Sequence, residues 1–251
     1  MQWSISRISF RLILALVLVG AAPAVFADQA IVKNMAAFDQ ANIAALALSN
    51  QGKGEATLKA MNTLQARWKV FLTNSSNAFP GDQAWKAGLD KAGTVIAKAA
   101  GEAKAGTIAE VHETLEEIRA IFVTLRADRK VEYYIDYLNL YHDVMEQAAA
   151  VATGKSESTF SSADARTVAA ILPKLQAEWK KARGATLDRD VYMISEAKVG
   201  ELEKAMQATQ ASIDKLDAAL HSGMNGQVYA AVNALKPAFT RSFLMFGKFE
   251  S

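Results

Sequence analysis

Apolar residues recur along this chain at intervals of three and four, without the alternation that marks a strand. Such spacing places side chains on one face of a helix, so the pattern predicts an all-α protein. Glycine, serine, asparagine and proline gather between the periodic stretches, where they favour turns. We expect eight helices, at about 29–50, 55–75, 82–103, 107–127, 132–153, 162–183, 192–221 and 226–248.

Local signals mark where some of these helices begin or bend. A side-chain oxygen just ahead of a helix can accept a hydrogen bond from its first backbone amides, which favours a start at that point. The residues predicted to cap helices in this way are Asp82, Thr107 and Ser161 or Ser162. Proline removes a backbone donor and clashes with the preceding turn. We therefore expect Pro173 and Pro237 to kink or locally break their helices.

The two halves of the chain resemble each other. Leu64-Gln-Ala-Arg-Trp68 recurs as Leu175-Gln-Ala-Glu-Trp179, and Lys86-Ala-Gly88 recurs as Lys198-Val-Gly200. These repeats predict two tandem, internally duplicated four-helix up-down bundles, one at 28–129 and one at 130–251. Trp68 and Trp179 would each anchor the core of one bundle.

The first 27 residues have the pattern of a secretory signal peptide. Arg7 and Arg11 precede an apolar run at 12–19, and Ala24-Val-Phe-Ala27 offers a cleavage site after Ala27. The apolar run is too short to span a membrane, and no second run follows. We expect a periplasmic or secreted mature protein without an integral membrane segment.

Composition narrows the possible partners of the mature chain. The whole sequence has 28 Lys and Arg against 26 Asp and Glu, and two arginines fall in the signal, so the remaining charges balance. A neutral chain without a basic stripe gives no electrostatic reason to expect nucleic acid as a partner. The absence of cysteine excludes disulfides, thiolate metal sites and attached c-type haem.

Two of the three histidines stand four residues before a glutamate. The pairs are His112 with Glu116 and His142 with Glu146. Residues four apart lie on one face of a helix, so each pair can direct an imidazole and a carboxylate at one place. Imidazole and carboxylate together suit Zn, Fe, Mn or Cu ions, among which the sequence does not distinguish. Asp136 and Asp143 could orient the imidazole of His142 from behind.

A shared site requires the chain to reverse between the two pairs. Neither glycine nor proline occurs between Gly106 and Gly154, so one continuous helix is the alternative. The apolar stripe, however, does not continue across the charged segment 126–130, which favours a hairpin. A reversal near Arg129 would bring Glu116 opposite His142.

Other interpretations remain open at this stage. The two pairs could be structural ion pairs, and His221 is expected to interact with the end of its own helix. Phe239, Phe243, Phe246 and Phe249 could form core or a partner-binding groove. A b-type haem held by Met35 and His112 would need a shifted bundle.

The sequence thus favours an exported protein that binds a transition metal for storage, delivery or sensing. The ligands would be His112, Glu116, His142 and Glu146. An envelope interaction or adaptor protein that binds a protein partner or small ligand without a metal is the alternative. No catalytic motif is present, which makes an enzyme the weaker hypothesis.

Overall fold

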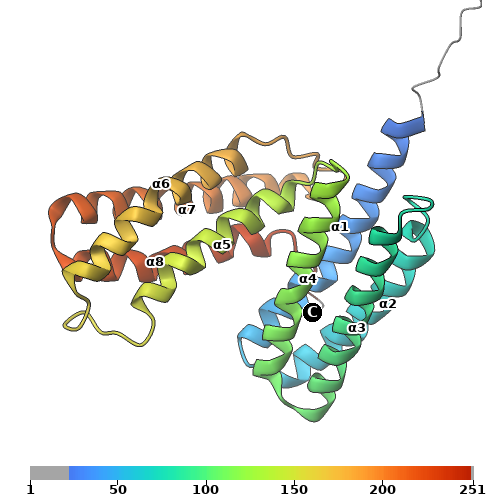
Figure 1. Cartoon of the computed structure of the whole chain (residues 1–251), viewed down its shortest axis with the longest axis horizontal. Helices are drawn as coiled ribbons and strands as arrows, with labels where there is room; N and C mark the ends of the chain where they lie inside the picture. The colour runs from blue at the N-terminus through green and yellow to red at the C-terminus, as the bar shows by residue number, and fades with distance from the viewer. Residues whose placement is uncertain (1–22, 250–251) are drawn as a thin grey trace, which may run out of the picture.

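The computed structural model describes residues 23–249, with side chains from residue 29 onward. The predicted signal peptide lies largely outside these residues. The described chain is all-helical, as predicted, and contains eight helices (Figure 1). They are α1 (Pro23–Asn50), α2 (Gly54–Ser75), α3 (Gln83–Ala105), α4 (Ile108–Asp128), α5 (Tyr134–Ala152), α6 (Ser162–Gly184), α7 (Glu196–Ser222) and α8 (Asn225–Leu244).

The local signals account for several helix ends. The Asp82 side chain accepts a hydrogen bond from the backbone of Trp85, and Ser161 forms a reciprocal capping box with Asp164. Thr107 stands at the N-cap position of α4, as predicted, but its side chain makes no capping hydrogen bond. Helices α6 and α8 continue through Pro173 and Pro237 without a break.

The eight helices form two groups of four. In the first group α1 contacts α2 and α4, while α3 contacts α2 and α4. The second group repeats this pattern, with α5 beside α6 and α8 and with α7 beside α6 and α8. Fewer contacts join the groups, mainly from α1 to α8 and from α4 to α5, and the groups diverge in Figure 1.

The apolar core runs through both groups without interruption. In the first group, Trp68 stacks on Phe71 and lies edge-on to Phe38. In the second group, Trp179 packs against Tyr141. Both tryptophans are buried, as the repeat predicted.

The chain reverses between α4 and α5, which confirms the predicted break. Lys130 has a φ of 54°, and the Val131 amide donates back to the carbonyl of Arg126, so the last turn of α4 is closed. The two helices then spread apart instead of running side by side.

A buried polar cluster holds the α4–α5 turn against α1. Arg126 is 2% exposed and donates from Nε to Asp136 at 2.7 Å, while its guanidinium lies over the Tyr133 ring. Tyr133 in turn donates its hydroxyl proton to Asp39 on α1. Burial raises the pKa of Asp39 to about 6, although nearby Arg126 opposes this shift. The cluster therefore links α4, α5 and α1 at the turn where the two groups meet.

Candidate metal and ligand site

His112 on α4 has one ring nitrogen fixed by the backbone of α1. Its Nδ1 lies 3.2 Å from the carbonyl oxygen of Leu46. A carbonyl can only accept, so Nδ1 must donate, and Nε2 is the nitrogen whose lone pair is available. Nε2 lies 3.6 Å from Oε1 of Glu116, one turn along the same helix. Nε2 of His112 and Oε1 of Glu116 therefore face each other as two hydrogen-bond acceptors, unless a proton or a cation lies between them.

His142 on α5 is paired with Glu146 in the same way. Its Nε2 lies 3.3 Å from Oε1 of Glu146, and Lys236 Nζ of α8 lies 2.9 Å from the same oxygen. The hydrogen bond from His142, followed by the contact with Lys236, lowers the pKa of Glu146 to about 2. Glu146 is therefore a carboxylate at any physiological pH.

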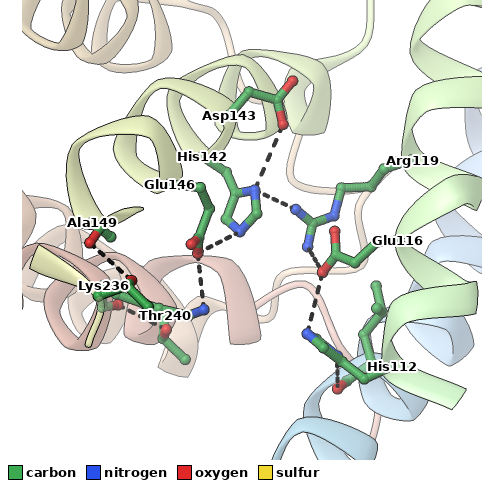
Figure 2. Close-up of polar contacts among 11 residues, drawn as sticks. His112, Glu116, Arg119, His142, Asp143, Glu146, Ala149, Lys236 and Thr240 are labelled. Carbon is green, nitrogen blue, oxygen red and sulfur yellow. Dashed lines mark hydrogen bonds and ion pairs between the residues drawn. The ribbon is translucent and has the colours of Figure 1, made fainter. Parts of the chain in front are cut away.

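Arg119 joins the two pairs across the space between α4 and α5 (Figure 2). One guanidinium nitrogen lies 2.6 Å from Nδ1 of His142, and another lies 2.9 Å from Oε1 of Glu116. Arginine can only donate, so His142 accepts at Nδ1 and carries its proton on Nε2, which points at Glu146. The Arg119 Nε is buried and has no hydrogen-bond partner, and the guanidinium lies against the Phe243 ring.

These side chains line one cavity of about 290 Å³ between the two helix groups. Its polar wall carries the two His–Glu pairs together with Arg119, Lys236 and Thr240. Its apolar wall comes from α1 and α8, where Ile43, Leu46, Phe239 and Phe243 contribute. The cavity therefore offers charged groups and an apolar surface to the same occupant.

The structure thus brings the four predicted metal ligands, His112, Glu116, His142 and Glu146, to one cavity. They do not converge on a single point. Within residues 23–249, no three His, Asp or Glu side chains are grouped closely enough to hold a metal ion. Arg119 occupies the position between the pairs, so a metal shared by both would require that side chain to move.

The predicted supporting residues have different positions. Asp143 Oδ1 lies 3.7 Å from His142 Nδ1, beyond hydrogen-bond distance, and its side chain is mostly exposed. Asp136 instead binds Arg126 in the buried cluster. His221 contacts the Asp217 carbonyl and carboxylate at the end of α7, consistent with its predicted structural role.

The side chains considered for haem ligation point to different places. The Met35 sulfur lies near the Arg126 guanidinium, at 3.7 Å. His112 contacts Leu46, eleven residues further along α1 and so about 16 Å away along the helix. No common site lies between Met35 and His112. Of the predicted phenylalanine stripe, Phe239, Phe243 and Phe246 are buried, while Phe249 is exposed.

The sequence analysis missed both cationic residues of the cavity, Arg119 and Lys236. Arg119 follows Glu116 by three residues, a spacing that places both on one helix face, so its position could have been predicted. Lys236 comes from α8, ninety residues from its partner Glu146, and no local pattern indicates that contact.

The chain matches no protein-family model, and comparisons with curated proteins and with solved structures give no match either. In the part of the chain that the structure describes, no helix is long and apolar enough to cross a membrane.

Proposed function

We propose that this chain is an exported, non-enzymatic protein that binds a transition metal ion in the cavity between two duplicated four-helix units. His112, Glu116, His142 and Glu146 are the proposed ligands, and Asp143 is the proposed support for His142. The observation that carries the proposal is that both His–Glu pairs, which lie far apart in the sequence, line the same cavity.

The orientation of His112 supports the proposal. A ligating histidine commonly donates its other ring nitrogen to a carbonyl or carboxylate, which fixes the ring and leaves a lone pair for the metal. His112 has this arrangement, because Nδ1 faces the Leu46 carbonyl and Nε2 faces Glu116. A cation between Nε2 and Oε1 would remove the repulsion of two facing lone pairs.

Equilibrium dialysis of residues 28–251, purified without an affinity tag, against Zn²⁺, Cu²⁺, Mn²⁺ or Fe²⁺ tests the proposal. We expect one ion to be retained per chain. His112→Ala and His142→Ala should each remove most of the binding, and the double variant should be little worse, because both residues would serve one site. His221→Ala is the matched control and should bind like the wild type. Lack of retention at about 10 μM of every ion, or silence of both variants, contradicts the proposal.

A second candidate is an interaction protein that takes a small organic ligand or a protein partner without a metal. The ion pairs of Arg119 with Glu116 and of Lys236 with Glu146 favour it, because they already neutralise both carboxylates. Under this alternative the two histidine variants would change stability without changing metal retention.

A further inference from the structure

The charges in the cavity balance before any metal enters. Arg119 and Lys236 supply two positive charges, and Glu116 and Glu146 supply two negative ones. Glu113 also lines the cavity, but its side chain is exposed to solvent. A divalent ion placed among partly buried groups that already balance would leave an excess of positive charge, which is costly away from bulk water.

Arg119 also prevents His142 from binding a metal in the present arrangement. While Arg119 donates to Nδ1, the ring proton must lie on Nε2, the nitrogen that faces Glu146. A protonated nitrogen has no lone pair for a metal. Metal binding at Nε2 therefore requires Arg119 to leave and the ring proton to move from Nε2 to Nδ1. From Nδ1 the ring can donate a hydrogen bond to the nearby Asp143 carboxylate once the two side chains approach.

Once it leaves His142 and Glu116, Arg119 needs another acceptor. Its Nε already lacks a partner, and Lys236 would lose Glu146 to the metal. A small carboxylate or carbonate would satisfy both cations and supply the missing negative charge. The cavity of about 290 Å³ is several times larger than a single ion needs, so it has space for such an anion.

Building on the proposed function, we infer that the cavity takes its metal ion together with a small carboxylate or carbonate anion, held by Arg119 and Lys236. The anion draws the two cations away from Glu116, Glu146 and His142, and so releases these three ligands to the metal. Metal and anion should then bind with positive coupling, each raising the affinity for the other by the same factor.

Equilibrium dialysis of residues 28–251 with Zn²⁺ and ¹⁴C-malonate, in bicarbonate-free buffer, tests the inference. We expect one malonate to be retained per chain when Zn²⁺ is present, little malonate without Zn²⁺, and about tenfold tighter Zn²⁺ binding with malonate. Replacing malonate by ¹³C-bicarbonate and following the bound carbon by NMR distinguishes a carbonate from a carboxylate.

Variants of the two cations separate anion binding from metal binding. Arg119→Gln and Lys236→Gln should lose malonate retention, and malonate should change their Zn²⁺ affinity by less than about twofold. Matched controls come from ion pairs outside the cavity, Arg189→Gln and Lys181→Gln, which should behave like the wild type. Circular dichroism of each variant verifies that the helices are retained.

The possible failures point to different conclusions. Zn²⁺ binding that neither malonate nor bicarbonate strengthens, or equal anion retention by wild type and Arg119→Gln, overturns the inference and leaves the metal proposal standing. Malonate retention without Zn²⁺ overturns the coupling. If Zn²⁺ is retained neither with malonate nor without it, the metal proposal itself fails.

Discussion

Asp39 is a carboxylate whose charge depends on the fold around it. Its ordinary pKa is 3.8, and burial raises the pKa to about 6 in the folded chain. Between these two values the folded state binds more protons than the unfolded state. The favourable contribution of Asp39 is therefore complete below about pH 4 and is lost as the pH rises through 6.

Asp39→Asn should consequently stabilise the protein at high pH, because an amide carries no charge to bury. We expect the free energy of unfolding in urea to rise at pH 8 by as much as about 3 kcal/mol and to change less at pH 5. Asp90→Asn, an exposed carboxylate on α3, is the control and should have little effect. If Asp39→Asn is equally or less stable than the wild type at pH 8, then the buried Arg126 needs the Asp39 carboxylate in addition to that of Asp136.

At the scale of residues, the sequence predicted only local relations within the site. The spacing of four residues identified both His–Glu pairs because helical geometry fixes that neighbourhood. It gave Asp136 the wrong neighbour, since the buried Arg126 provides a stronger partner than His142. Lys236 reaches Glu146 only through the packing of α8 on α5, which no local spacing encodes.

Individual helices show how the two halves of the chain differ in packing. Gly88 on α3 and Gly200 on α7 occupy matching places in the repeated sequence. A Cβ at Gly88 would lie 2.6 Å from a terminal carbon of Leu125, whereas a Cβ at Gly200 would meet open space. The first position therefore needs glycine for close approach to α4, and the second does not.

The pair Gly88→Ala and Gly200→Ala tests this difference with the same chemical change in both helices. Gly200→Ala should raise the free energy of unfolding by roughly 0.5–1 kcal/mol, because alanine favours a helix. Gly88→Ala should be less stable than Gly200→Ala by about 1–3 kcal/mol, because the added methyl overpacks Leu125. Chemical denaturation followed by circular dichroism measures both. Equal stabilisation of the two variants would show that α3 and α4 can separate at no cost.

Helices were predictable because their apolar period is a local property of the sequence. All eight were expected, and the largest errors were the start of α1, placed at 29 instead of Pro23, and the start of α7, placed at 192 instead of Glu196. The segment before α7 buries Tyr192 and Ile194 without being helical, so its apolar residues resembled a helix stripe. The helix-breaking effect of Pro173 and Pro237 was overestimated, because α6 and α8 continue through them.

Over the whole molecule, the two groups share one core and should unfold together. Within residues 28–251, Trp68 and Trp85 report on the first group and Trp179 reports on the second. Trp179→Phe leaves fluorescence from the first group alone, and it removes an indole nitrogen that has no hydrogen-bond partner. We expect the fluorescence and circular dichroism of this variant to give the same urea midpoint. Two separate midpoints would mean that each group is an independent folding unit.

The arrangement of the groups was beyond the reach of sequence patterns. The break after α4 was predicted, but the contacts that accompany it were not: these are the buried cluster around Arg126 and those of the C-terminal segment. There the Lys248 amide donates to the Gln40 carbonyl of α1, a contact between the two ends of the described chain. Such contacts join residues that are remote in sequence, so no periodicity reveals them.

The α4–α5 turn is a point about which the two helices could rotate relative to each other. Arg119 lies nine residues before the end of α4, and His142 lies eight residues after the start of α5, so each is about 13 Å from the pivot. A rotation of about 10° at the turn would shift one side chain relative to the other by about 2 Å, which is enough to break their 2.6 Å contact. A partner that binds to both α4 and α5 could therefore open or close the cavity without contacting it.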